Sequence, residues 1–364
     1  MTAFGRFLNK KNYSPIGFEI GSAALRMVQL VRADAGVGMQ AMVDVALRDA
    51  DGEQEALAGT IRDLVREHRF RGKRVVSVLS GRDVDFLPMQ ISTGPEQAIE
   101  EKIYENARTR LSFDIADAVI DYLPIDPGPQ EGEKNRRFLI VACRRSVVER
   151  HVHIVKSAGL RPVAIDIAPC ALLRTLEMCG CAIQGQSIII YLGDKGVLFV
   201  YLYNGSILAV RSYNRGYRHL VERLTAGLDI DRQSARRLLG DYGLSGNSVP
   251  CDDPGAPGTG GIAAVTREII VPVFHELLGA LNEFCTYCWG IVHDDALDRA
   301  FLTGKASRVR AMGAAVNRVL DADTHIVDPL QAVCADVPAG GHGAVAHGSV
   351  LCMPVGLALR EWMS

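Results

Sequence analysis

Two glycine turns, each set between short apolar segments, are the clearest candidates for chemistry in this sequence of 364 residues. The first, Gly21, follows the apolar segment 16–20, and the second, Gly193, ends the apolar segment 187–193. Tight turns can aim successive backbone N–H groups at one anion. If the two turns face each other, they predict a cleft that holds a phosphate chain from both sides. A glycine between two strands is more often only a turn, so the pattern alone leaves both interpretations open.

The other chemical motifs in the sequence are incomplete. Neither a P-loop nor a G-x-S-x-G nucleophile motif occurs. Cys285 and Cys288 form a C-x-x-C pair, but no second pair of ligands follows at zinc spacing. The nine cysteines form no regular framework, and we expect reduced thiols. His342 and His347 lie in a glycine-rich stretch that we interpret as a turn rather than a metal site.

The composition predicts a globular protein with an extensive core and two to three domains. Hydrophobic residues make up 48% and charged residues 23% of the chain, which excludes a mainly disordered protein. The 40 basic and 42 acidic residues nearly cancel, and this balance argues against a general nucleic-acid binder. No apolar run approaches the ~20 residues that cross a bilayer, and no secretory signal is evident. The start, MTAFGRFLNKK, is expected to be a frayed terminus rather than a lipid anchor.

Hydrophobic periodicity predicts the elements that position the two turns. Each turn opens a meander of strands followed by helices, which indicates two related α/β halves. Strands are expected at 16–20, 25–31, 39–47, 75–80, 84–91, 119–125, 138–143, 162–167, 187–193, 197–203, 206–213, 299–304 and 324–327. Helices are expected at 53–69, 95–110, 145–158, 169–179, 217–228, 231–240, 263–292 and 306–320, with a final apolar helix from about 346. Residues 126–137 and 243–261 are expected to be loops.

Several stretches, in order, resemble the PilM-type proteins of type IV pilus assembly, which belong to the actin-like ATPases and are related to the division protein FtsA. The first, IGFEIGSAALRMVQL, is similar to their first phosphate loop. The other similar stretches are 73–91, 99–125, 138–177, 299–312 and 353–361. The resemblance covers nearly the whole chain, with the glycine-rich segment 243–261 as the main exception.

The resemblance implies an α/β fold, actin-like and ribonuclease H-like, with duplicated domains about a nucleotide cleft and an inserted subdomain as in FtsA and PilM. Domain 1 is expected over 13–169, with the insert at about 73–143. The C-terminal helix 346–364 is expected to return to this domain. Domain 2 is expected over 170–345, with a mobile loop at 243–261.

The resemblance also implies where ATP or ADP with Mg²⁺ would lie, namely against both phosphate loops and the glycines that follow them. The candidate nucleotide-binding residues are Glu19, Gly21, Ser22, Ala23, Arg26, Gly193, Asp194, Gly216, Gly304 and Lys305. Glu19 is the candidate metal contact, through a bound water.

Several of these positions depart from the family pattern. The family Asp of the first loop is Glu19, and the family Lys is Arg26, which has a different geometry. The Asp expected two residues before the second glycine turn is Tyr191, and Asp194 is interpreted as a turn residue. Lys305 stands where the second glycine of a Gly-Gly pair is usual. Because one carboxylate is missing, we expect weak or absent ATP hydrolysis and assign no catalytic residue.

PilM-type proteins bind the N-terminal cytoplasmic tail of the inner-membrane protein PilN. The resemblance therefore implies a cytoplasmic scaffold at the inner membrane that holds a PilN-like tail as an extended peptide near the inserted subdomain. Pilus motor ATPases are further candidate partners, membrane contact is expected to be indirect, and the oligomeric state stays open. Three alternatives also stay open: an active ATP-dependent switch or ATPase on the same fold, a type II secretion platform, and an FtsA-like filament-forming membrane tether.

Overall fold

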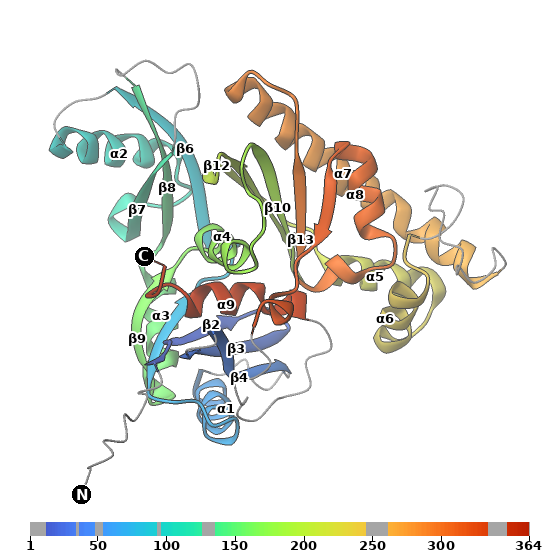
Figure 1. Cartoon of the computed structure of the whole chain (residues 1–364), viewed down its shortest axis with the longest axis horizontal. Helices are drawn as coiled ribbons and strands as arrows, with labels where there is room; N and C mark the ends of the chain where they lie inside the picture. The colour runs from blue at the N-terminus through green and yellow to red at the C-terminus, as the bar shows by residue number, and fades with distance from the viewer. Residues whose placement is uncertain are drawn as a thin grey trace, which may run out of the picture.

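Three β-sheets with the helices that cover them organise the chain (Figure 1). The computed structural model describes residues 12–33, 36–47, 54–92, 96–125, 135–244, 261–333 and 348–363. The predicted loop segments 126–134 and 245–260, together with His342 and His347, lie outside the described residues.

The first sheet has six strands and carries the first glycine turn. Its strands are β1 (Asn12–Tyr13), β2 (Ile16–Ile20), β3 (Ala24–Ala33), β4 (Gly36–Ala46), β5 (Arg74–Val78) and β9 (Arg161–Asp166). β2, β3 and β4 form an antiparallel meander, and β5 and β9 continue the sheet in parallel. Apolar side chains of α1 (Gln54–Glu67) and α3 (Arg145–Ser157) pack on one face, and those of α9 (Cys352–Ala358) pack on the other.

The second sheet has five strands and repeats this arrangement around the second turn. Its strands are β10 (Gln186–Leu192), β11 (Val197–Tyr203), β12 (Ser206–Tyr213), β13 (Arg299–Thr303) and β14 (Asp323–Ile326). The order β12-β11-β10-β13-β14 matches β4-β3-β2-β5-β9 of the first sheet, an antiparallel meander continued by two parallel strands. The surrounding helices are α4 (Ala168–Met178), α5 (Tyr217–Leu228), α6 (Arg232–Asp241), α7 (Ile262–Val292) and α8 (Met312–Leu320). The sequence repeat therefore corresponds to a repeated sheet topology.

A small antiparallel sheet is inserted between β5 and α3. It consists of β6 (Val84–Ser92), β7 (Ala118–Ile125) and β8 (Asn135–Arg144) in the order β6-β8-β7. The helix α2 (Glu96–Arg110) packs on one face through Ile99 and Ile103, against Phe138 and Ile140 of β8. β5 belongs to the first sheet, so the separate sheet within the expected insert 73–143 begins only at Val84.

Two predicted helices are shorter than their patterns indicated. The segment 306–320 consists of a 3-10 turn, Lys305–Arg308, followed by α8. Ala311, between the two, has a left-handed backbone conformation with φ 64° and so interrupts the predicted helix. The Ser307 hydroxyl donates to the Gly304 carbonyl oxygen within that turn. The final helix begins as a 3-10 turn, Gly348–Leu351, and α9 ends at Ala358, so the predicted range 346–364 was too long. Other short 3-10 turns are Ile115–Asp117 and Pro329–Gln331.

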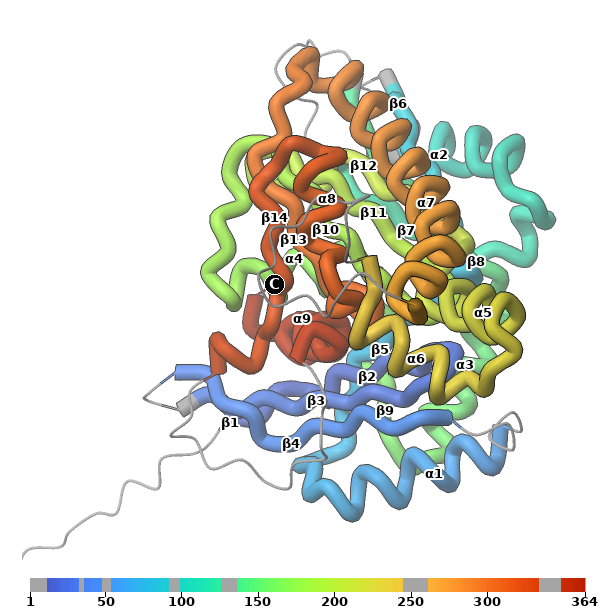
Figure 2. Tube along the Cα trace, turned by 90° about the vertical axis from the view of Figure 1, so that its right-hand side faces the viewer, coloured from blue at the N-terminus to red at the C-terminus, as the bar shows by residue number. Residues whose placement is uncertain are grey.

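The helix α9 joins the two halves because backbones approach it closely from both sides (Figure 2). A Cβ at Gly17 of β2 would overlap the Pro354 carbonyl oxygen, and one at Gly356 would overlap the Ala171 carbonyl oxygen of α4. The Thr175 hydroxyl of α4 also donates to the Cys352 carbonyl oxygen at 2.7 Å. This packing fixes β2, and with it the first turn, relative to the second half.

A buried histidine couples the first sheet to its covering helix. The Nε2 atom of His151 in α3 lies 2.8 Å from the Ser77 hydroxyl of β5, and the imidazole is tilted against the ring of Phe18. Burial lowers the pKa of His151 from 6.5 to about 4, so the folded protein holds this imidazole neutral.

We expect the stability of the protein to fall between pH 6.5 and pH 4 because of His151. In this window the unfolded state takes up a proton that the folded state rejects, so the loss reaches roughly 3 kcal/mol at the acid end. Denaturant unfolding across this range should show a smaller slope with pH for His151→Gln, which retains a hydrogen-bonding group. An unchanged slope in that variant would show that another group controls the acid sensitivity.

Candidate functional site

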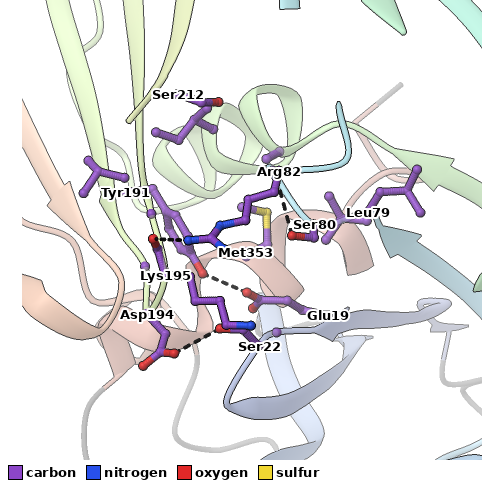
Figure 3. A pocket seen from close by; sticks show the side chains of 18 of the residues that line it. Glu19, Ser22, Leu79, Ser80, Arg82, Tyr191, Asp194, Lys195, Ser212 and Met353 are labelled. Carbon is purple, nitrogen blue, oxygen red and sulfur yellow. Dashed lines mark hydrogen bonds between the residues drawn. The ribbon is translucent and has the colours of Figure 1, made fainter. Parts of the chain in front are cut away.

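The two glycine turns face one cavity of about 140 Å³ between the halves (Figure 3). The first turn is closed by the Gly21 N–H, which donates to the Ala24 carbonyl oxygen at 2.9 Å. Most of the predicted site residues line this cavity: Glu19, Gly21, Ser22, Ala23, Arg26, Gly193, Asp194 and Lys305. Gly216 and Gly304 are not among its lining residues. The structure therefore brings both turns together around a shared space.

Side chains from the two turns bond directly to each other across the cavity (Figure 3). The Tyr191 hydroxyl at the end of β10 donates to Oε1 of Glu19 on β2 at 2.7 Å. The Ser22 hydroxyl donates to Oδ2 of Asp194 at 3.0 Å. Position 191, where the resemblance implies an Asp, thus carries a donor that bonds across the cleft.

Two arginines add further contacts between the halves. Arg218 of α5 pairs with Asp194 at 3.0 Å and donates to the Ser22 carbonyl oxygen at 3.3 Å. Arg82, just before β6, donates to the Lys195 carbonyl oxygen at 3.1 Å. Sequence reasoning missed both arginines, because nothing local distinguishes them from ordinary surface cations.

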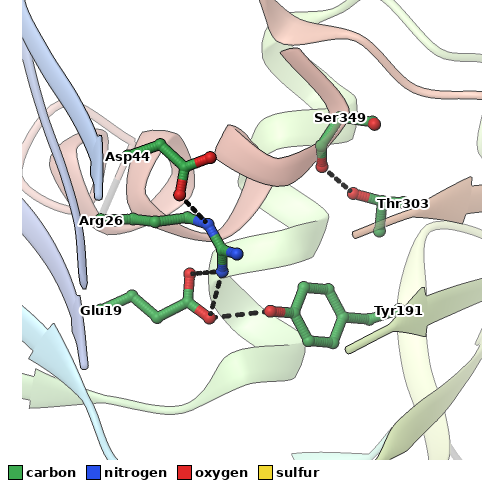
Figure 4. A network of polar contacts seen from close by, with 6 residues as sticks. All are labelled: Glu19, Arg26, Asp44, Tyr191, Thr303 and Ser349. Atoms are coloured by element: carbon green, nitrogen blue, oxygen red, sulfur yellow. Dashed lines mark hydrogen bonds and ion pairs between the residues drawn. The ribbon is translucent and has the colours of Figure 1, made fainter. Parts of the chain in front are cut away.

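Glu19 belongs to a row of charges that crosses the first meander (Figure 4). Register places Glu19 opposite Arg26, and Arg26 opposite Asp44, on three adjacent strands. Arg26 donates through one terminal nitrogen to both Glu19 oxygens at 3.4 Å, and through Nε to Asp44 at 3.0 Å. Sequence analysis did not identify Asp44, although aligning the strands of the predicted meander would have placed it beside Arg26.

Burial and charge fix the protonation states in this row. Burial alone would lower the pKa of Arg26, but Glu19, Tyr191 and Asp44 outweigh it and raise that pKa, so the guanidinium stays charged. Burial, with the adjacent Glu19 charge, raises the pKa of Tyr191 well above its ordinary value. The phenol is therefore a permanent donor, and the Glu19 carboxylate is held by Arg26 on one side and Tyr191 on the other.

Gly216 has a structural explanation that involves no ligand. A Cβ at this position would lie 2.6 Å from the Gly193 carbonyl oxygen and 2.7 Å from that of Asp194. The next two N–H groups, of Tyr217 and Arg218, donate to those same oxygens at 3.0 and 2.8 Å. The start of α5 is thereby attached to the second turn through the backbone.

Gly304 and Lys305 also serve the fold. Gly304 has φ 85°, and a Cβ there would lie 2.7 Å from the Leu192 carbonyl oxygen, so glycine is needed where the chain leaves β13. The Lys305 ammonium lies 4.9 Å from the ring centroid of Tyr217, a cation–π contact. Burial lowers the pKa of Lys305.

In this closed arrangement the carboxylates that line the cleft are engaged by the protein's own side chains. Both oxygens of Glu19 accept from Arg26, and Oε1 also accepts from Tyr191. The described residues contain no group of three or more His, Cys, Asp or Glu side chains that could hold a metal by themselves. The cavity is also smaller than the roughly 300 Å³ at which small-molecule pockets begin. A water-mediated metal contact at Glu19 stays a prediction.

The C-x-x-C pair consists of buried thiols. Cys285 and Cys288 are fully buried in α7, and burial raises the pKa of Cys285 to about 12. Burial likewise raises the pKa of Cys179 to about 12. Thiols held protonated in this way are poor nucleophiles and poor metal ligands.

The sequence matches the family model described as Type IV pilus assembly protein PilM over residues 17–237. Among solved structures, the PilM–PilN type IV pilus biogenesis complex aligns with a TM-score of 0.76 at 23% identity, covering 95% of this chain and 98% of that chain. The ethanolamine utilization protein EutJ from Carboxydothermus hydrogenoformans aligns with a TM-score of 0.54 at 15% identity, covering 96% and 89%. MreB 5 of Spiroplasma citri bound to AMPPNP aligns with a TM-score of 0.50 at 12% identity, covering 96% and 95%.

These structural matches confirm the expected actin-like fold. Because the sequence identities are below 25%, the matches support the fold alone. A search of curated proteins returned no match. No helix among the described residues is long and apolar enough to span a bilayer.

Removing the Tyr191 hydroxyl should destabilise the closed cleft. Tyr191→Phe removes the shorter of the two hydrogen bonds to Oε1 of Glu19, and a bond to a charged group of this kind is worth about 2 kcal/mol. The matched control is Tyr287→Phe, at a half-exposed tyrosine on α7. Urea unfolding should show the loss for the first variant alone, and equal stability of both variants would argue against a bond between the halves.

Proposed function

Because the chain belongs to the PilM family of type IV pilus assembly proteins, we propose that it is a scaffold that binds the N-terminal cytoplasmic tail of a PilN-like inner-membrane protein. The observation that supports this most directly is the family match, together with a fold match over nearly the whole of both chains to a structure titled as a PilM–PilN complex. On this proposal the protein works in the cytoplasm, at the inner membrane, and its product is an assembled platform rather than a chemical change.

The inserted sheet offers the kind of edge on which an extended tail can bind. Among the described strands, β7 pairs with β8 alone, so its other edge is open to an added strand. Part of this edge is already satisfied locally. Arg145 of α3 donates to the Ala118 carbonyl oxygen at 3.1 Å, the Tyr122 N–H donates to the Asp121 carboxylate at 2.8 Å, and Pro124 has no N–H to offer. These features limit unspecific pairing with other strands at this edge. We place the tail along the backbone groups of the edge that stay open, where the insert meets α3.

The central cleft, on this proposal, is a fixed joint that holds the insert and the two halves in one arrangement. The hydrogen bonds of Tyr191, Ser22 and Arg82 each join residues on opposite sides of the cleft, where a bound nucleotide would lie between them. Nucleotide binding would require the bond between Tyr191 and Glu19 to open. Hydrolysis is not part of the proposed function, because Tyr191 stands where the resemblance implies a second-loop Asp, and its hydroxyl bonds to Glu19, the candidate metal contact.

A synthetic peptide of the PilN-like N-terminal tail should bind the full chain in isothermal titration. Hydrogen exchange on the complex should then show slower exchange for backbone amides of β7. The strands β12 and β14 act as internal controls, because they are also edge strands but belong to the sheet of the second half. Binding with slower exchange confined to β14 would contradict the proposed site. No binding at all would contradict the proposed partner.

Phosphate release from ATP with Mg²⁺ should stay at the level measured without protein. The reason is that Glu19 is bonded to Arg26 and Tyr191 and cannot serve a metal-bound water. The variant Glu19→Ala should give the same background. Rapid turnover that depends on Mg²⁺ and disappears in that variant would favour the alternative of an active ATPase on this fold.

A further inference from the structure

A cluster of exposed cations at one end of the first sheet takes part in neither the cleft nor the tail edge. The segment 66–74, REHRFRGKR, contains five arginines and lysines and one glutamate. We use the name cationic pole for the following exposed residues: Arg32, Arg66, Arg69, Arg71, Lys73, Arg74, Lys156 and Arg161.

Backbone and side-chain bonds bring these residues to the same end of the sheet. The Arg161 N–H at the start of β9 donates to the Lys73 carbonyl oxygen at 2.7 Å. The side chain of Gln29 on β3 bonds both the N–H and the carbonyl oxygen of Arg71 at 2.7 Å. The segment before β5 therefore lies directly beside the middle of β3 and the start of β9.

The ends of two helices complete the pole. Arg66 lies in the last turn of α1, and Lys156 lies in the last turn of α3. Arg62 of α1 donates to the Ser157 carbonyl oxygen at 2.7 Å, which ties the two helices together. In Figure 1, α3 and β9 lie side by side at this edge of the first half.

Most of this charge is not neutralised within the protein. Arg66 pairs with Asp63, and Arg74 pairs with Glu361. In the part of the chain that the structure describes, the following cations of the pole have no carboxylate partner: Arg69, Arg71, Lys73, Lys156 and Arg161. Exposed like charges gathered at one end of the sheet repel one another, so an anionic surface would stabilise the arrangement.

Amphipathic groups lie at the same pole. Arg32 stacks over the indole of Trp362 at 4.7 Å from the ring centroid, and the neighbouring Met363 is 38% exposed. Asn12, where the described chain starts, is opposite Arg32 in register. An indole and an exposed methionine beside a cationic surface are typical of contact with lipid headgroups.

We propose that the cationic pole binds the anionic surface of a phospholipid bilayer. The combination of unneutralised cations with Trp362 and Met363 favours a bilayer over an acidic protein, because headgroups supply the charge and the interfacial region accepts the amphipathic side chains. This goes beyond the proposed function, in which the protein reaches the membrane only through the tail of its partner.

The test is co-sedimentation of the full chain with vesicles of phosphatidylcholine alone or of equal parts phosphatidylcholine and phosphatidylglycerol. The pole variant combines Arg71→Ala, Lys73→Ala and Arg161→Ala. The matched control combines Arg232→Ala, Arg236→Ala and Arg237→Ala on α6, which removes three exposed cations from the second half. Circular dichroism confirms that both variants fold. The vesicles contain no partner protein, so this result is separate from the test of tail binding.

We expect the wild type to bind the phosphatidylglycerol vesicles and not the neutral ones, with weaker binding as salt rises. The pole variant should bind about a hundredfold more weakly, since each of the three cations removed contributes roughly fivefold near an anionic surface, while the control variant keeps its affinity. Absence of binding to anionic vesicles, or equal losses in the two variants, would overturn the proposal. Tighter binding to soluble polyglutamate than to the vesicles would also overturn it and assign the pole to an acidic protein.

Discussion

The hydrogen bond from Tyr191 to Glu19 is the interaction on which the closed arrangement of this protein depends. Glu19, Arg26 and Asp44 form a row of charges across one face of the first meander, in a setting where an unpaired charge would be costly. Arg26 bonds to both Glu19 oxygens at 3.4 Å, and the shortest hydrogen bond to Glu19, at 2.7 Å, comes from Tyr191 in the opposite half. The second half thus completes the polar network of the first.

This dependence explains why the same fold can serve as a joint. The two sheets repeat one topology, and α9 fixes them through backbone contacts at Gly17 and Gly356. The residues at the tips of the two turns then meet across the cavity. A joint closed by its own side chains presents the inserted sheet in one defined orientation, which suits a protein whose proposed work is binding.

Much of the fold could be predicted from the sequence, because alternation and helical periodicity are local signals. The repeated meanders and most helices were predicted. The interruption at Ala311 was not, because the spacing of hydrophobic residues carries no signal for an alanine in the left-handed backbone conformation. Within the site, the departure at Tyr191 was visible in the sequence, whereas its bond to Glu19 depends on how far apart the halves lie. Gly216 lies where backbones approach closely, which the sequence did not reveal, and its predicted contact with nucleotide stays a prediction. Cations that are distant in sequence, such as Lys73 and Arg161, meet only once the sheet has formed.

A crystal structure of the full chain, determined from crystals soaked with ATP and Mg²⁺, would test the central claim most directly. The account predicts that the Tyr191 hydroxyl stays within hydrogen-bond distance of Glu19, with no nucleotide between the turns at Gly21 and Gly193. A structure in which the Tyr191 side chain has swung away and a triphosphate lies between those two turns would contradict it.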